Sequence, residues 1–210
     1  MDVLSPFVSY FQRPETEVRA DLESFAALLR KWNAVQNLVS RETESALWER
    51  HIADSIQILP LVRHADERFL DIGSGGGLPA IPLAIALKGG HATFQLVEPI
   101  GKKVAFLRQA IRELGLNASV HAGRSDTLDS RETRFDVITS RALAALPELL
   151  ELIHPFFGPE TRAILHKGRD HARELEESRL AWEFDVVLTN SATEVGAVLL
   201  QVSNLRRKHS

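Results

Sequence analysis

The first part of the chain carries a helical pattern of apolar positions. Five residues repeat at alternating spacings of four and three, and they would share one helix face: Val18, Leu22, Phe25, Leu29 and Trp32. A second helix is predicted over residues 45–59, with Thr43 or Ser45 near its start and Pro60 ending it. Residues 1–64 therefore predict an N-terminal helical extension.

From Arg68 onward the pattern changes to alternating strands and helices. Strands are expected at 69–72, 93–97, 119–121, 135–139 and 162–166, and helices at 78–87, 102–114, 147–153 and 171–180. Such alternation implies a parallel sheet with helices on both faces. The last two strands, 184–188 and 197–202, are joined by too short a loop for a helical crossover, so they should pair antiparallel. Residues 65–210 thus predict one α/β domain with a seven-stranded, mostly parallel sheet.

The turn after the first predicted strand is rich in glycine. Gly73, Gly75, Gly76 and Gly77 occupy four of five positions, and Leu78 follows them. Glycine lets the backbone bend sharply and come within contact distance of a ligand, although such a turn can also be purely structural. Leu78 breaks the G-x-G-x-x-G fingerprint of dinucleotide binding. The turn resembles instead the first motif of S-adenosylmethionine (SAM)-dependent methyltransferases, whose sheet also ends in an antiparallel hairpin.

Further candidate cofactor contacts lie at the ends of the next strands, where ligands bind in open α/β sheets. Glu98 ends the second strand, and its carboxylate could accept hydrogen bonds from both ribose hydroxyls. Ser125 and Asp126 follow the third strand and could meet an adenine, while Arg141 after the fourth faces the methyl-transfer side. The alternatives are that Glu98 is a solvated loop acid and that Ser125-Asp126 is a helix N-cap.

Composition narrows the possible functions. The chain has 210 residues, of which 44% are hydrophobic and 25% charged, as in ordinary globular proteins. It has no cysteine, which excludes disulfides, thiolate metal sites and cysteine nucleophiles, and its histidines lack the spacing of zinc ligands. No apolar run approaches the roughly 18 residues of a membrane span, and no signal peptide is visible, so a cytoplasmic location is expected. With a net charge of −3, nucleic-acid binding would need a local basic patch.

The residues after the fourth strand restrict the methyl acceptor. Methylation of a pyrimidine ring carbon usually needs a cysteine, and exocyclic amines usually go with an Asn/Asp-Pro-Pro-aromatic turn, where this chain has Ser140-Arg141-Ala142-Leu143. Ribose 2′-O transfer uses a Lys-Asp-Lys-Glu set, of which Lys167 could be one member, but the aspartate is missing. Acceptors with a free lone pair remain, and guanine N7 is one, because it needs orientation and electrostatics but no proton removal.

An ordered set of short motifs carries a closer resemblance. These are Trp32-Asn33, Asn37-Leu38, Arg50-His51-x-x-Asp54-Ser55, Asp71 to Pro79, Gly101-Lys102-Lys103, Phe106-Leu-Arg108, Ser140-Arg141-Ala142 and Leu165-His-Lys167-Gly168. Together they resemble the bacterial 16S rRNA guanine-N7 methyltransferase G family, also called glucose-inhibited division protein B. Each motif alone is weak, but their order over about two-thirds of the chain is specific.

The resemblance implies a class I SAM-dependent methyltransferase of Rossmann-like fold that acts on 16S rRNA or the small-subunit ribonucleoprotein. It implies a monomer without metal or membrane. The cofactor-binding residues expected from it are Gly73, Gly75, Leu78, Glu98, Ser125, Asp126 and Arg141. Arg141 and Lys167 are expected to flank the guanine as catalytic residues. Leu143 stands where the family commonly has Phe.

Basic residues near the predicted ligand end of the sheet are candidates for RNA contacts. Arg50, Lys102, Lys103 and Arg108 could hold phosphates with strong salt dependence. Lys102 and Lys103 could also be a solvated helix start, although cations there oppose the helix dipole. His51 and Asp54, three positions apart, could orient each other or simply pack together.

Two other functions stay open at this point. One is a SAM-dependent methyltransferase acting on a small molecule, for which a closed apolar pocket would be expected. The other is a nucleotide- or RNA-binding regulator without catalysis.

Overall fold

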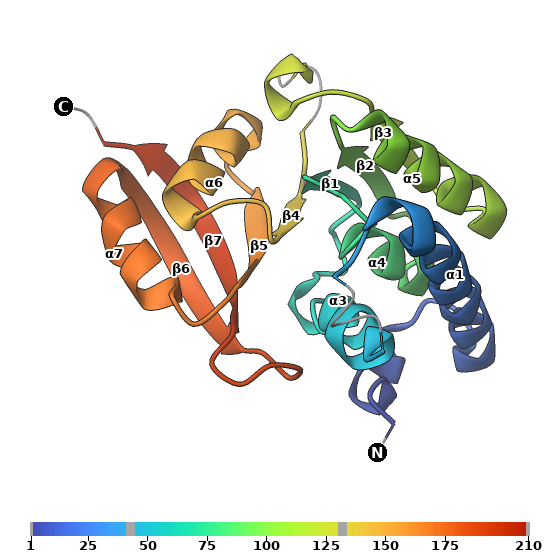
Figure 1. The fold of residues 1–210 in the computed structure, drawn as a ribbon. Helices are drawn as coiled ribbons and strands as arrows, with labels where there is room; N and C mark the ends of the chain where they lie inside the picture. Colours follow the sequence, from blue (N-terminus) through green and yellow to red (C-terminus); the bar gives the residue numbers. More distant parts are fainter. Residues whose placement is uncertain (1, 41–44, 130–133, 209–210) are drawn as a thin grey trace.

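The protein is built around one mixed sheet of seven strands in the order β3-β2-β1-β4-β5-β7-β6 (Figure 1). This computed structural model describes residues 2–40, 45–129 and 134–208. The strands are β1 Arg68–Ile72, β2 Thr93–Val97, β3 Ala118–His121, β4 Val137–Arg141, β5 Arg162–Lys167, β6 Trp182–Asn190 and β7 Val198–Arg207. The first five strands pair in parallel, whereas β7 pairs antiparallel with both β5 and β6. The predicted fold class is thereby confirmed.

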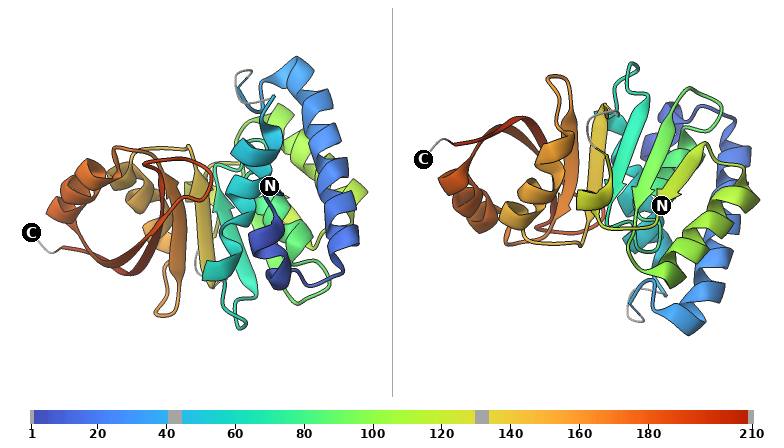
Figure 2. Two further views of the ribbon diagram at one scale, coloured as in Figure 1. Left: turned by 90° about the horizontal axis from the view of Figure 1, so that it is seen from below. Right: turned by 90° about the horizontal axis from the view of Figure 1, so that it is seen from above.

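Helices cover both faces of this sheet (Figure 2). The longer ones are α1 Glu15–Gln36, α4 Ala80–Ala86, α5 Gly101–Leu114, α6 Leu146–Ile153 and α7 His171–Ala181. A π-helix, Trp48–Ala53, runs directly into the short α3, Asp54–Ile56. Short 3-10 turns complete the chain at Ser5–Tyr10, Leu59–Leu61, Ser125–Thr127 and His154–Phe156. Within the described residues, none of the helices combines the length and apolar character that a membrane span requires.

Successive side chains along each strand point to opposite faces of the sheet, and each face has its own apolar cluster. Phe69 of β1 packs into an apolar cluster with α1, α4 and α5, while its neighbours Leu70 and Ile72 pack into a second cluster with α6. Trp182 at the start of β6 belongs to this second cluster. Both faces of the central strands are therefore buried, as expected for a parallel sheet.

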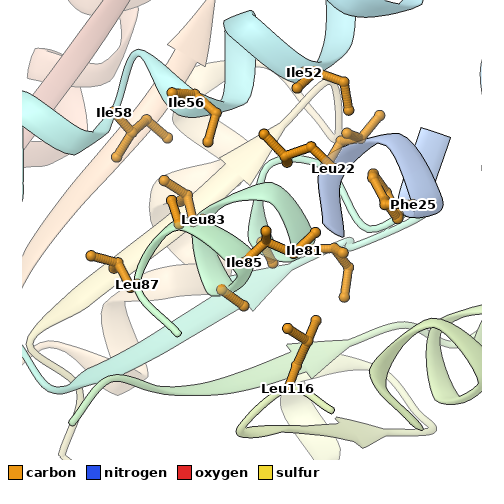
Figure 3. Packing of buried hydrophobic residues seen from close by; sticks show 14 of the residues in the cluster. Leu22, Phe25, Ile52, Ile56, Ile58, Ile81, Leu83, Ile85, Leu87 and Leu116 are labelled. Atoms are coloured by element: carbon orange, nitrogen blue, oxygen red, sulfur yellow. The ribbon is translucent and has the colours of Figure 1, made fainter. Parts of the chain in front are cut away.

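The N-terminal helices share their core with the sheet. Figure 3 shows Leu22 and Phe25 of α1, together with Ile52 and Ile56, close to Ile81 of α4. All five side chains are fully buried. The N-terminal segment thus packs directly on the glycine-loop helix, and the division at residues 64 and 65 stays a prediction, because one apolar cluster spans it.

Several predicted boundaries were wrong. The helix predicted from residue 78 begins at Ala80, because Gly77 has φ +77° and the glycine turn continues through Leu78. Pro79 is consequently the N-cap residue rather than the first helical residue. Pro60 does not end the second helix. It lies in the following 3-10 turn, at an early position where no N–H is needed. Thr43 lies outside the described residues.

The strands also differ in extent from the prediction. The fourth strand starts at Val137 instead of residue 135 and continues to Arg141, because Ser140 and Arg141 pair with β5. The two C-terminal strands are longer than predicted. Most residues of β6 are exposed, and the residues that extend it beyond the predicted range include the polar Glu183 and Asn190, which give no strand signal. This extension brings the turn at residues 191–197 towards α3 (Figure 1).

Candidate cofactor and acceptor site

The glycine loop between β1 and α4 depends on backbone angles that favour glycine. Gly73, Gly75 and Gly77 have φ values of +73°, +51° and +77°. A Cβ on Gly77 would lie 2.5 Å from Cγ1 of Ile81, so this glycine is needed for close packing of α4. A Cβ on Gly73 would lie 2.7 Å from Cδ1 of Leu143, which covers the loop from the turn after β4. The loop therefore exposes bare backbone on one side and packs tightly on the other.

The glycine loop faces a cavity of about 340 Å³. Its wall includes Gly73, Gly75 and Leu78 from the loop, and also Leu38, Val39, Ser40, His51, Lys103, Arg141 and Ala142. The segment after α1 closes this side, since a Cβ on Gly76 would lie 3.3 Å from the backbone oxygen of Leu38. The N-terminal extension is thus a wall of the cavity. Sequence reasoning did not assign residues 38–40 to the site.

Glu98 lies against the glycine loop in an anchored position. Its Oε2 accepts a hydrogen bond from the N–H of Gly75 at 2.8 Å, and its Oε1 accepts one from the N–H of Ile100 at 2.9 Å. Only 3% of the residue is exposed, so the alternative of a solvated loop acid is wrong. Each carboxylate oxygen keeps a further lone pair, which leaves capacity for two hydroxyl donors.

Ser125 and Asp126 lie in a 3-10 turn after β3, beside the end of β2. Ser125 is buried, whereas Asp126 is exposed and lies 3.5 Å from Nε of Arg124. Arg124 occupies the N-cap position of this turn without a side-chain capping bond, so the predicted alternative of a Ser-Asp cap is wrong. Neither residue lines the cavity at the glycine loop. Their contact with an adenine stays a prediction.

Asp71 lies buried behind the glycine loop. Its Oδ1 accepts a hydrogen bond from the hydroxyl of Thr139 at 2.7 Å, which ties β1 to β4. Its Oδ2 has no hydrogen-bond partner among the described residues. Burial raises the pKa of Asp71 from 3.8 to about 7, more than the Thr139 hydrogen bond lowers it. Burial therefore favours the protonated carboxyl up to near neutral pH, and its hydrogen bond links β1 to β4 directly behind the loop.

Arg141 at the end of β4 is the meeting point of several groups from the N-terminal extension. Its Nη2 donates to Nδ1 of His51 at 2.7 Å and to the backbone oxygen of Arg50 at 3.2 Å. Its Nη1 lies 3.3 Å from Oδ2 of Asp54. The sequence left open whether His51 and Asp54 orient each other or simply pack together, and in the structure both contact the guanidinium of Arg141.

The imidazole of His51 is held neutral. Burial lowers the pKa of His51 from 6.5 to about 4, and the nearby charge of Arg141 lowers it further than Asp54 raises it. A neutral ring with its proton on Nε2 leaves Nδ1 free to accept from Arg141, because a guanidinium only donates. Burial likewise lowers the pKa of Arg141 itself.

A second cavity of about 240 Å³ also has Arg141 in its wall. Arg141 and Ala142 line both cavities, so the two spaces adjoin at this pair. The rest of the wall is formed by Arg50, Asp54, His166, Lys167, Gly168, Ser191, Thr193, Glu194, Ala197 and Val198. Ala142 has φ +53°, an unusual value for a residue with a side chain, and such strain often marks functional sites.

Lys167 lines the second cavity but already has two partners. Its Nζ lies 2.6 Å from Oε2 of Glu174 and donates to the backbone oxygen of Ala144 at 3.0 Å. Glu174 also accepts from the N–H of Leu146 at 2.7 Å. This pair therefore holds the turn after β4 onto α7. Only 9% of Lys167 is exposed, and its expected role beside the guanine stays a prediction.

The four basic residues expected to bind RNA do not form one site. Arg50 lines the second cavity, where its Nη2 lies 3.2 Å from Oε2 of Glu194. Lys103 lines the cavity at the glycine loop. Lys102 and Arg108 are exposed on α5, away from both linings. A chain of phosphates would have to cross the ligand end of the sheet to reach all four.

The turn at residues 191–197 is the largest part of the site that sequence reasoning missed. Its residues Ser191, Thr193 and Glu194 were interpreted only as a connecting loop, and their pattern contains no signal for a site. In the described parts of the chain, no group of histidines and acids is arranged to hold a metal ion.

Comparison with known proteins shows the family of the chain. The family model for rRNA small subunit methyltransferase G (GidB) matches residues 18–202. The chain belongs to this family. A ribosomal RNA small subunit methyltransferase G from Brucella ovis is 45% identical over 188 residues, which cover 89% of this chain and 88% of that protein.

Solved structures share the fold at low sequence identity. A glycopeptide N-methyltransferase, MtfA, complexed with SAM matches with a TM-score of 0.59 at 13% identity, over 73% of this chain and 93% of that chain. A ribosomal protein L11 methylase from Lactobacillus delbrueckii subsp. bulgaricus matches with a TM-score of 0.57 at 16% identity, over 76% and 79% of the two chains. The fold is therefore that of class I SAM-dependent methyltransferases.

Family membership confirms the central predictions of the sequence. The protein is a SAM-dependent methyltransferase of the small-subunit rRNA family, and the predicted guanine-N7 specificity fits this family. The two alternatives, a small-molecule enzyme and a regulator without catalysis, do not fit it.

Proposed function

We propose that the protein transfers the methyl group of SAM to N7 of a guanine in 16S rRNA, with donor and acceptor on opposite sides of Arg141 and Ala142. The observation that supports this placement is the pair of adjoining cavities, which share these two residues. In-line transfer forms the bond from N7 to the methyl carbon as the bond from carbon to sulfur breaks and S-adenosylhomocysteine leaves, so the three atoms must lie on one line. Donor and acceptor would therefore have to meet directly beside Arg141 and Ala142, where the two cavities adjoin.

The donor would lie along the glycine loop. Bound SAM supplies a methyl group on a positively charged sulfur. Gly73 and Gly75 allow close approach of the backbone, and Leu78 lines the same cavity. Glu98 would accept from the ribose hydroxyls, since each of its oxygens makes one hydrogen bond to the backbone and keeps further capacity. Ser125 and Asp126 would meet the adenine.

The acceptor would enter the second cavity, towards Arg141 and Lys167. Guanine N7 already holds a lone pair, so no residue has to remove a proton. Arg141 would donate a hydrogen bond to O6 of the guanine. O6 and N7 lie on the same edge of the base, and this pair of acceptors distinguishes guanine from the other bases. A donor on N7 itself would block the reaction, so the fixed orientation of Arg141 is essential. The neutral His51 next to it adds no positive charge close to the sulfonium.

Affinity for the RNA would come from phosphate contacts. Arg50, Lys102, Lys103 and Arg108 lie at or near the ligand end and would neutralise phosphates. Because each neutralised phosphate releases counterions, binding would weaken steeply as salt is raised. We further propose that the protein acts as a monomer in the cytoplasm, on 16S rRNA or on the assembled small subunit.

The test is methyl transfer from labelled SAM to RNA of a strain that lacks this modification. Naked 16S rRNA and purified small subunits are used in parallel arms, and the products are digested to nucleosides. Label in 7-methylguanosine is the expected result in at least one arm. Label in another nucleoside, or SAM binding without any transfer in both arms, would overturn the proposal. Light scattering of the purified protein tests the monomer.

A further inference from the structure

Asp54 lies at a junction of four elements around Arg141. Its Oδ1 accepts from the hydroxyl of Thr193 at 2.6 Å and from Nε2 of Gln57 at 2.7 Å. Its Oδ2 lies 3.3 Å from Nη1 of Arg141, and its backbone oxygen accepts from Nε2 of His166 at 2.8 Å. Oδ1 is therefore hydrogen-bonded, whereas Oδ2 forms an ion pair with Arg141 in which Nη1 makes no hydrogen bond to a described residue. The carboxylate connects α3 to the end of β4 and to the β6–β7 turn, and the backbone oxygen connects it to the end of β5.

The same turn is attached to the N-terminal extension at two further points. The N–H of Ala192 donates to Oε1 of Gln57 at 2.8 Å, and Glu194 forms its ion pair with Arg50. Figure 1 shows this turn, in red, reaching towards α3. Residues 191–197 are thus held in place by the helical extension rather than by the sheet alone, and they form one wall of the second cavity.

An arginine needs such a support to act on a base. Its side chain is long and carries much rotamer freedom, and its planar donors recognise a partner only in a defined orientation. The guanidinium of Arg141 is held by one full charge, that of Asp54, and by the neutral acceptors His51 and Arg50 O. Among these only Asp54 offsets its charge, and Asp54 is itself fixed by Thr193 and Gln57.

We propose that Asp54 is a positioning residue for the transfer reaction, which holds Arg141 towards the acceptor and couples that orientation to the β6–β7 turn through Thr193. This inference rests on the proposed function. It assigns a role in the acceptor site to the turn at residues 191–197, which lies far from the cofactor loop in sequence.

The experiment compares variants of the full-length protein with RNA as substrate. Asp54→Asn keeps the size of the side chain and removes its charge. Thr193→Val removes only the hydroxyl that fixes Asp54, and Thr193→Ser restores it. The matched control is Asp66→Asn, because Asp66 forms another buried pair with an arginine, Arg162, at the opposite end of β5. SAM affinity, kcat, KM for RNA and Tm are measured for each.

We expect Asp54→Asn to lower kcat about 100-fold, the effect of misplacing a positioned group by about 1 Å. KM for RNA and SAM affinity should change less than about fivefold, since the phosphate contacts and the glycine loop are untouched. Thr193→Val should lower kcat about tenfold by the same route, with recovery in Thr193→Ser. Asp66→Asn should lower Tm and leave kcat unchanged.

A double-mutant cycle shows whether Asp54 acts through Arg141. If it does, Asp54→Asn adds no further loss of kcat to Arg141→Met, because the group that it positions is already absent. Full additivity of the two losses, or a kcat within threefold of wild type in both Asp54→Asn and Thr193→Val, would overturn the inference. Failure of the proposed function itself would be visible earlier, as absence of 7-methylguanosine with the wild-type protein.

Discussion

Substitution of Gly73 by alanine tests two features of the glycine loop, its left-handed backbone and its close packing against Leu143. Gly73 has φ +73°, and an added Cβ would lie 2.7, 2.9 and 3.1 Å from Cδ1, Cδ2 and Cγ of Leu143. Gly75 has φ +51°, but its Cβ would meet nothing closer than 3.8 Å. Gly75→Ala is therefore a matched control that carries the backbone strain without the contact to Leu143.

The magnitudes follow from these distances. A left-handed backbone costs a residue with a side chain about 1–2 kcal/mol. Displacing Leu143 from its rotamer adds about 0.5–1.5 kcal/mol. Gly73→Ala should therefore destabilise the fold by about 1.5–3.5 kcal/mol, which lowers Tm by about 3–14 °C in a protein of this size. In a Leu143→Ala background the contact is gone, so the cost should fall to that of Gly75→Ala, about 1–2 kcal/mol.

Two measurements check this reasoning. Thermal unfolding gives the stability of the single and double variants, and calorimetry gives their affinity for SAM. Gly73→Ala should also weaken SAM binding at least tenfold (roughly 1.4 kcal/mol), because Gly73 lines the cavity that we assign to the donor. Equal losses for Gly73→Ala with and without Leu143 would refute the role of this contact. Unchanged SAM affinity would refute the placement of the donor.

Three further predictions concern buried polar groups at the site. Asp71 has its pKa raised to about 7 in the folded state, so the native state binds the proton more tightly and stability falls by up to about 4 kcal/mol as the pH rises from 4 to 7. Denaturant unfolding at pH 5 and pH 8 should show the part of this loss that falls between these values, about 2–3 kcal/mol, in the wild type and not in Asp71→Asn; equal losses in both proteins would contradict it. His51 has its pKa lowered to about 4, so its effect on stability has the opposite sign. The stabilisation is fully present above pH 6.5, and up to about 3 kcal/mol of it is lost as the pH falls to 4. His51→Asn should remove that part of the acid-side slope, and an unchanged slope would count against a neutral buried ring. Glu98→Gln should lower SAM affinity about 10- to 100-fold in calorimetry, the value of a charge-assisted hydrogen bond, whereas an unchanged affinity would mean that Glu98 only supports the loop.

The sequence determined the architecture of the protein and the contact between its glycine loop and Glu98. The order of strands and helices follows from periodicity, and the glycine loop and Glu98 were found because both lie at carboxyl ends of strands that parallel pairing brings together. This reasoning needs only local patterns and one topological rule. The boundaries that failed were those where glycine conformation or long-range pairing decides, such as the start of α4 at Ala80 and the end of β4 at Arg141.

The acceptor side was decided by tertiary structure. Asp54 and Thr193 are separated by 139 positions, and Arg141 and His51 by 90, so their hydrogen bonds depend on how the helical extension packs on the sheet. Likewise, Lys167 was expected to flank the guanine, and its ion pair with Glu174 was not foreseen, because it exists only where α7 folds back over the turn after β4. Local periodicity contains no information on such contacts, because they follow from burying two apolar faces together and not from any motif in the residues that meet.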